Sequence, residues 1–483
     1  MNNMNENRSV VTQKNLPLTF IKNVRSATFR RVLLSGICLT FAACASVSST
    51  ETDLENLNGS IPAEWLLELP SDNGPVLSWI DLYGDPILQD YLILAAEKNY
   101  DIRIAQTRVR RAEAELDRAK AQLIPRLDLT ASASGSALLS DIEDPFDSYG
   151  LNLSGRWDPD VFGQTRTNIA ASRASLLAQD ALEADTRQAV LASTARAYIL
   201  AVEAKLQVEL AKTNLDFLSE SRRISESRYR LGDTAKGDFS FAEANYQSAL
   251  ASYESTVQAA RSSRRALSIL LGDYPDETLR LAEDLSEPTA LPARDLPATL
   301  LQRRPDVIAA RAQLAGQVAA LRGAKLNRWP SIGITGGLSS ASNFSDLFDP
   351  GDYIARLGAS LSQVLFDGGA INAGIESARA DLEGSLLSYE QRLRRAMAEI
   401  TDAYDRAETL QRILVNLEAS SEAANEALRL ASIQFDLGES SLLDVLQVQS
   451  RVNNIDASLI RTKADLIETV IIANDAVAGF NEY

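Results

Sequence analysis

The most prominent feature of the hydrophobic pattern is two long segments that lack helix breakers. Residues 164–231 contain neither Gly nor Pro, and residues 385–437 are also free of both. As one helix the first segment would extend about 100 Å, because an α-helix rises about 1.5 Å per residue. In the second segment apolar residues recur alternately four and three positions apart, which is typical of a coiled-coil seam. The seam comprises Leu382, Leu386, Tyr389, Leu393, Ala396, Ile400, Ala403, Ala407, Leu410, Leu414 and Leu417.

Each long helix is expected to reverse and return through a second helix. The pattern predicts long helices at about 164–231 and 370–437, and returning helices at about 238–271 and 441–478. Gly232 and Gly438 follow the long helices, where a glycine allows the left-handed C-cap that reverses a chain. Shorter helical stretches at about 86–122 and about 305–328 precede them, and a Pro closes each. The fold is therefore predicted to be mostly α, with long antiparallel helices.

Four short stretches alternate between apolar and polar residues and predict a small β part. They lie at about 126–137, 148–158, 331–340 and 352–363. Period-two alternation indicates strands with one apolar and one polar face. Their length fits transmembrane barrel strands, and a soluble sandwich is equally compatible. The polar phase holds Arg126, Asp128, Arg156 and Arg356, which we expect to face a barrel lumen or its rim.

The chain repeats itself once at a spacing of 204–207 residues. Matching pairs include Asp101-Ile102 with Asp306-Val307, Pro125 with Pro330, Phe162 with Phe366, Ala197-Tyr198 with Ala403-Tyr404, Leu231-Gly232 with Leu437-Gly438, and Gly272 with Gly479. Because these pairs keep one order, both halves are predicted to have the same elements. We place the first repeat at 85–290 and the second at 291–483.

Composition removes several classes of function. The 483 residues include no His and two Cys, with 48 Lys plus Arg against 65 Asp plus Glu. Without His there is no Ser-His or Cys-His nucleophile pair and no His-ligated metal. The acidic balance argues against a nucleic-acid groove. No catalytic residue, cofactor or metal site is predicted. A carboxylate-pair hydrolase is the remaining enzymatic alternative, but the acids mostly occupy helical solvent positions.

The N-terminus has the features of a secretory signal. Residues 1–43 carry six basic residues and one acid, and a mostly apolar run of about 12 residues ends at Ala43. Small residues before Cys44 resemble the lipobox of bacterial lipoproteins, although Phe41 stands where Leu is usual. We expect Cys44 to be the mature N-terminus, carrying diacylglycerol and an N-acyl chain, with 44–84 as a tether. A plain signal with an incidental Cys is the alternative.

The strands and the signal together constrain assembly. The smallest bacterial single-chain barrels use eight strands, and lipid does not tolerate open sheet edges. Four strands per chain therefore require oligomerisation if they span a membrane.

Several motifs resemble the TolC-like outer-membrane efflux proteins, and most closely their OprM/NodT lipoprotein branch. The motifs are Leu296-Pro297-Ala298-Thr299-Leu300-Leu301-Gln302-Arg303-Arg304-Pro305-Asp306-Val307, Trp329-Pro330-Ser331-Ile332-Gly333-Ile334-Thr335-Gly336, Val364-Leu365-Phe366-Asp367-Gly368-Gly369 and the opening stretch 79–102. The resemblance runs from the signal to the C-terminus, with Trp329 where Phe is usual.

The resemblance implies a homotrimer in the cell outer membrane. Three chains would supply twelve strands to one β-barrel, and their helices would form a periplasmic α-barrel. It also implies a periplasmic adaptor and an inner-membrane pump as partners, with this chain as a passive exit duct. A proton-driven pump is the first expectation. An ATP-driven exporter or type I secretion system, and a non-channel coiled-coil envelope lipoprotein, are the alternatives.

The tips of the long helices are the candidate mechanistic sites. By resemblance, Arg228, Leu231, Gly232, Leu437 and Gly438 contact the adaptor. Asp444, Gln447, Phe435 and Asp436 are assigned to a periplasmic gate, with three Asp444 carboxylates converging in the trimer. Asp444 is equally compatible with an ordinary acidic residue in a first helical turn. Phe435 stands where some relatives have a Tyr that latches the mouth, and Phe cannot make that hydrogen bond.

Overall fold

A computed structural model describes residues 84–138, 141–286, 303–342, 349, 351 and 353–477. They all belong to one unit, Asn58–Tyr483. The predicted signal segment, Cys44, almost all of the predicted tether and Gly479 lie outside the described residues.

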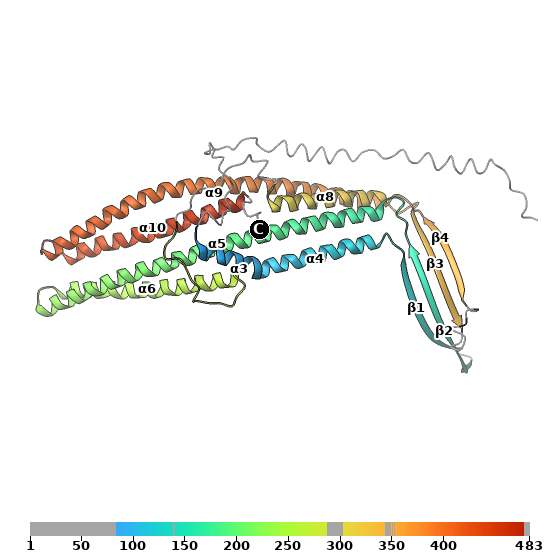
Figure 1. The fold of residues 1–483 in the computed structure, drawn as a ribbon, viewed down its shortest axis with the longest axis horizontal. Helices are drawn as coiled ribbons and strands as arrows, with labels where there is room; N and C mark the ends of the chain where they lie inside the picture. Colours follow the sequence, from blue (N-terminus) through green and yellow to red (C-terminus); the bar gives the residue numbers. More distant parts are fainter. Residues whose placement is uncertain are drawn as a thin grey trace, which may run out of the picture. The chain divides into compact units, whose positions relative to one another are not determined.

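Two helical hairpins and a four-stranded sheet account for most of the described residues (Figure 1). The helices are α3 Pro86–Lys98, α4 Tyr100–Ala121, α5 Gln164–Leu231, α6 Lys236–Leu270, α8 Pro305–Leu326, α9 Ala370–Asp436 and α10 Leu442–Ala476. Helix α5 runs beside α6, and α9 runs beside α10. The prediction of a mostly helical fold with a small β part is confirmed. No helix in this part of the chain is both long and apolar enough to cross a membrane.

The first helical stretch is broken at Asn99, which the sequence pattern did not indicate. Asn99 leaves the helical region with ψ 134°, and its side-chain oxygen accepts hydrogen bonds from the backbone N–H groups of Asp101 and Ile102. Its amide nitrogen donates to the carbonyl of Leu270 at 2.8 Å. The break therefore caps α4 and ties it to the end of α6.

The two long helices begin and end with the same devices. At the start of α5, Asp160 accepts hydrogen bonds from the N–H groups of Thr165 and Arg166. At the start of α9, Asp367 accepts hydrogen bonds from the N–H groups of Gly369 and Ile371. At the far ends Gly232 and Gly438 have φ values of 83° and 78°. In each case the following residue donates its N–H to a carbonyl five residues earlier. The left-handed reversal expected of these glycines is present.

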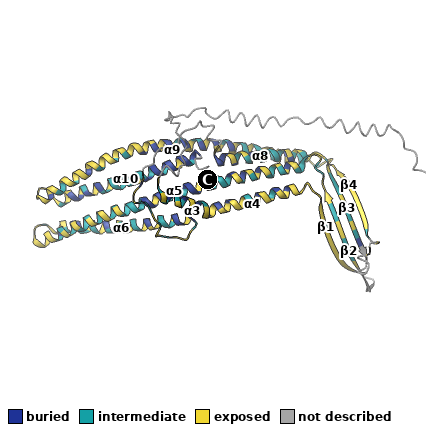
Figure 2. Cartoon of the chain, viewed as in Figure 1, coloured by how far each residue is buried: buried dark blue, intermediate teal, exposed yellow. Residues whose placement is uncertain are grey.

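The largest buried cluster joins both halves of the chain. It contains Leu88 and Leu92 of α3, Leu267 of α6 and Ile467 of α10, packed around the middle of α5. Seven consecutive seam positions of α9, from Tyr389 to Leu410, are also buried. The outermost seam residues are half-buried. Figure 2 shows this pattern, with exposed residues dominating the edge strands β1 and β4 and the helix tips, and residues of intermediate burial prominent in β2 and β3.

The sheet is antiparallel, in the order β1-β2-β3-β4. Its strands are β1 Arg126–Leu138, β2 Asp141–Trp157, β3 Ser331–Ser342 and β4 Ile354–Ser362. Strand β2 begins at Asp141 rather than at about 148, because backbone pairing with β1 extends beyond Tyr149 to Phe146 and resumes at Asp141 after a register shift. Each half of the chain supplies two neighbouring strands, and β2 pairs with β3 across the two halves. The same order of elements, helix–strand–strand–long helix–returning helix, occurs twice.

Candidate functional site

The four charged strand residues lie on one face of the sheet. The register pairs Arg126 with Arg156, and it aligns Asp128, Ser154, Gly337 and Arg356 across all four strands. Directly paired residues, and residues two apart on one strand, point to the same face. The structure therefore brings Arg126, Asp128, Arg156 and Arg356 together on one surface. Their position in a lumen stays a prediction.

These charges are mostly paired within their own strands. The Arg126 guanidinium donates to the Asp128 carboxylate at 2.8 and 2.9 Å, and Arg156 donates to Asp158 at 3.4 Å. Arg126 and Arg156 lie directly opposite each other, where like charges repel. The carboxylates of Asp128 and Asp158 offset this repulsion. Arg356 donates to the Ser339 hydroxyl at 3.2 Å. The result is a polar face of fixed, mutually supported charges.

The opposite face of the sheet is apolar and open. Its described members include Leu127, Leu129, Leu153, Trp157, Ile332, Ile334, Leu338, Leu357 and Leu361. Leu129 is 72% exposed and Leu357 is 87% exposed. A water-soluble sandwich would bury such a face against a second sheet. The arrangement instead fits a surface whose neighbour is lipid.

The helix tips bring the two hairpins into contact through Arg228 and Phe435. The Arg228 guanidinium, in the last turn of α5, lies 4.5 Å from the centre of the Phe435 ring near the end of α9. Phe435 is only 9% exposed. A cation over an aromatic face is attractive without any hydroxyl. A cation–π contact between Arg228 and Phe435 therefore links the two tips, although Phe435 has no hydroxyl group to form a hydrogen bond.

Asp444 forms a capping box at the start of α10. Its carboxylate accepts from the Ser441 hydroxyl at 2.7 Å and the Ser441 backbone N–H at 3.0 Å, while its own N–H donates to the Ser441 hydroxyl. These hydrogen bonds lower the pKa of Asp444. The local geometry thus gives this carboxylate a capping role in the single chain. Convergence of three copies stays a prediction.

The other proposed tip residues are on the surface. Leu231 and Leu437 are 76% and 69% exposed, and Asp436 is exposed beside them. Gln447 lines a groove of about 490 Å³ between α5, α6 and α10, together with Leu443 and Leu446. The tips therefore present Leu231 and Leu437 to solvent.

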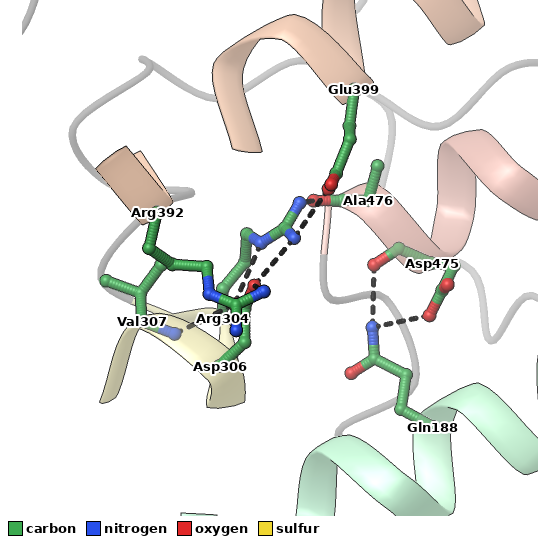
Figure 3. A network of polar contacts seen from close by, with 8 residues as sticks. All are labelled: Gln188, Arg304, Asp306, Val307, Arg392, Glu399, Asp475 and Ala476. Atoms are coloured by element: carbon green, nitrogen blue, oxygen red, sulfur yellow. Dashed lines mark hydrogen bonds and ion pairs between the residues drawn. The ribbon is translucent and has the colours of Figure 1, made fainter. Parts of the chain in front are cut away.

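A buried polar junction joins α8 to α9 and α10 (Figure 3). Arg304 donates through two nitrogens to the Asp306 carboxylate at 3.0 and 2.9 Å, to Glu399 at 2.8 Å and to the Ala476 carbonyl at 3.0 Å. Burial would lower the pKa of Arg304, but the hydrogen bonds and charges of Asp306 and Glu399 outweigh burial and raise the pKa. The Arg-Pro-Asp motif is therefore a structural clamp at the C-terminal end of α10.

Sequence reasoning missed the residues around this clamp. Asp185 and Gln188 of α5 and Asp475 of α10 line the same junction. Each lies in a long helix among many charged positions, so neither spacing nor composition distinguishes it from a solvated residue. Only Arg304 and Asp306 stood out in the sequence, because they belong to the family-like motif at 296–307, and that motif did not reveal which residues they contact.

The comparisons with known proteins agree with this geometry. The model of the family described as "Outer membrane efflux protein" matches residues 92–273 and 296–471. The pyoverdine export outer membrane protein OpmQ of Pseudomonas aeruginosa is 28% identical over 441 residues, covering 87% of this chain and 91% of that protein. Nodulation protein T of Rhizobium leguminosarum bv. trifolii is 26% identical over 436 residues, covering 87% and 92%.

Solved structures show the same architecture. The outer-membrane channel OprN superposes with a TM-score of 0.77 at 28% identity, covering 86% of this chain and 97% of that one. The open state of the MtrE channel of Neisseria gonorrhoeae superposes with a TM-score of 0.76 at 24% identity, covering 87% and 98%, and it supports the fold alone. With two-thirds or more of the chain matched in each comparison and both repeats recognised by the family model, this chain belongs to the outer membrane efflux protein family and is an outer-membrane protein.

Proposed function

We propose that three copies of this chain form the passive exit duct of a tripartite efflux system. The observation that carries the proposal is a four-stranded sheet with one apolar and one polar face and two unpaired edges, β1 and β4. Open edges are not tolerated in lipid, and one chain cannot close a barrel. Pairing β1 of one copy with β4 of the next gives twelve strands in a trimer, an even number within the range of known barrels.

The proposed trimeric duct also implies which partners the protein has and what it transports. The long hairpins would continue the barrel as a periplasmic tunnel, and their exposed tips would meet a periplasmic adaptor coupled to a proton-driven inner-membrane pump. The duct itself catalyses nothing and passes small molecules; pyoverdine export is named for the OpmQ relatives. Cys44 would add a lipid anchor, which the mass of the mature N-terminal peptide decides. An ATP-driven exporter is the alternative pump.

The edge pairing can be tested by disulfide cross-linking between copies. Thr130 of β1 and Ser360 of β4 both lie on the polar face, whereas Ala359 points to the apolar face. Coexpressed Thr130→Cys and Ser360→Cys chains, scanned with Arg356→Cys and Gly358→Cys for register, should give covalent oligomers. Combinations with Ala359→Cys should give few, because their side chains lie on opposite faces. No cross-link in any same-face combination, together with no conductance in planar bilayers, would refute the trimeric duct.

A second prediction concerns Asp444 at the mouth. If three Asp444 carboxylates converge to about 6 Å, each pair repels by roughly 3 kcal/mol at an effective dielectric near 20. Such a ring attracts cations, so cations added from the periplasmic side should block current, and Asp444→Asn should remove most of the block. Ser441→Ala is the matched control, since it weakens the capping box without removing the charge. Block that survives in Asp444→Asn would place the constriction elsewhere, with Asp436 the next candidate.

A further inference from the structure

The two halves of the chain correspond to each other residue by residue in their helices. Helices α4 and α8 have 22 residues each and begin 205 positions apart, at Tyr100 and Pro305. Helices α5 and α9 begin 206 positions apart, at Gln164 and Ala370. Helices α6 and α10, with 35 residues each, keep the same offset of 206. Each helical residue of the first repeat therefore has a defined counterpart in the second.

Inside the chain, the two repeats meet where α5 packs along α8. Glycines of α8 let the two helices approach closely. A Cβ at Gly316 would lie 3.6 Å from the Ala174 Cβ, and a Cβ at Gly323 would lie 3.5 Å from the Thr167 Cγ2. Ala174 and Thr167 are only 7% and 6% exposed. The face of α5 that carries these two residues is therefore covered by α8.

The corresponding face of α9 is bare. The counterparts of Thr167 and Ala174 are Ala373 and Ala380, and both are exposed. Gly384 lies on the same face, because residues four and seven positions apart share one side of a helix. A Cβ at Gly384 would meet no neighbouring atom within 4 Å. Within the described part of the chain, no other element covers this face of α9.

The helix that would cover this face lies at the other edge of the chain. By the same correspondence the counterpart of α8 is α4, and the counterparts of Gly316 and Gly323 are Arg111 and Arg118, which are both exposed. Helices α5 and α8 lie between α4 and α9, so α4 does not reach α9 of its own chain (Figure 1). A closed ring of copies brings α9 of one copy beside α4 of the next, as it brings β4 beside β1.

The charges of the two helices are complementary. The side chains of Arg118 and Asp381 form no hydrogen bond or ion pair among the described residues. Arg111 pairs only with Glu115 of its own helix, at 3.0 Å on the exposed surface. Asp381 follows Ala380 directly, at the border of the bare face. An arginine stem can therefore lie on this surface of small residues while its guanidinium reaches a carboxylate at the border.

We propose that α9 of one copy packs against α4 of the next copy in the same way that α5 packs against α8 within the chain. Arg111 lies on Ala380 and pairs with Asp381 of the neighbouring copy. Arg118 lies on Ala373. The inference rests on the proposed trimeric duct and names the residues that close the wall of its helical tunnel. The contact occurs three times in the trimer.

Cross-linking between copies tests the proximity of α4 and α9. Chains that carry one added cysteine each, and different tags, are coexpressed and treated with a short bifunctional maleimide. Arg118→Cys with Ala373→Cys should give a covalent dimer that carries both tags. Arg111→Cys with Ala380→Cys should do the same. Glu113→Cys with Ala380→Cys is the matched control and should give little dimer, because residues two positions apart on α4 do not share a face. The parent chain, with its native cysteines, sets the background.

A charge exchange tests the same contact by a second route. Arg111→Glu should lower the fraction of chains that stay trimeric in detergent on heating about fivefold, because each contact then opposes two acids. Adding Asp381→Arg to the same chain should restore most of that fraction. Since α4 and α9 of one chain are apart, this rescue requires contact between copies. Lys120→Glu is the matched control: it loses an equivalent ion pair, with Asp117, on the other side of α4, and it should change the trimeric fraction little. Semi-native gel electrophoresis measures these fractions.

Three results would each overturn the proposed contact. They are the absence of cross-links in both α4–α9 combinations, equal cross-linking in the Glu113→Cys control, and a failure of Asp381→Arg to rescue Arg111→Glu. The test of the sheet edges separates this inference from the duct itself. If the same-face β1–β4 combinations cross-link and the α4–α9 combinations do not, the trimeric duct stands and the α9–α4 contact is wrong. If neither set cross-links, both proposals fail.

Discussion

Replacing Arg304 by Met should lower the free energy of unfolding by about 3–5 kcal/mol, the cost of breaking a buried ion pair by removing one partner. The variant leaves the Asp306 carboxylate, which is 6% exposed, without its bidentate donor. It also leaves the Ala476 carbonyl at the end of α10 without its donor. Urea unfolding followed by circular dichroism measures the change, because the midpoint falls while the slope stays constant.

The double variant Arg304→Met/Asp306→Leu is the control for this prediction. Exchanging a whole buried pair for apolar residues of similar volume is often neutral or stabilising. The double variant should therefore recover at least half of the lost stability. Arg379→Met, which removes an exposed partner of Glu376, should change stability by no more than about 1 kcal/mol. If Arg304→Met unfolds like the parent, the junction is not a clamp.

Placing a charge on the apolar face of the sheet should destabilise the protein in the membrane. Leu129→Arg should reduce folding into lipid bilayers by about 2–4 kcal/mol if Leu129 lies near the midplane, and by less toward the interface. The side chain is 72% exposed on the face opposite Asp128 and Arg126, so no protein group compensates the new charge. Reversible urea unfolding in lipid vesicles measures the difference.

Thr130→Arg is the matched control because it changes the neighbouring residue on the polar face. It should fold with nearly parental stability and should instead alter the conductance or ion preference of the channel. Similar losses in both variants would show that lipid does not distinguish the two faces, and would contradict the assignment of the apolar face to lipid. A loss confined to Thr130→Arg would invert the assignment, as a one-residue register shift would do.

Several features of this protein were determined by the sequence alone. The breaker-free runs required long helices, and α5 occupies Gln164–Leu231, the segment that lacks Gly and Pro. The heptad spacing identified the buried stripe of α9, because side chains three and four positions apart share one helix face. Strict alternation identified which strand residues share a face, and Arg126 and Arg356 do so across four strands. These are local regularities, which a chain carries in its own order of residues.

Other features were decided only by the tertiary structure. The Asn99 break depends on the carbonyl of Leu270, which lies 171 residues away. The contact of Arg228 with Phe435 joins the tips of helices from different repeats. Asp185 and Asp475 resemble any other acid on a long helix, and only the packing of α5 against α10 half-buries them beside Gln188. Burial and partnership arise between segments distant in the chain, so no local pattern encodes them, and they determine which charges stay solvated and which form a site.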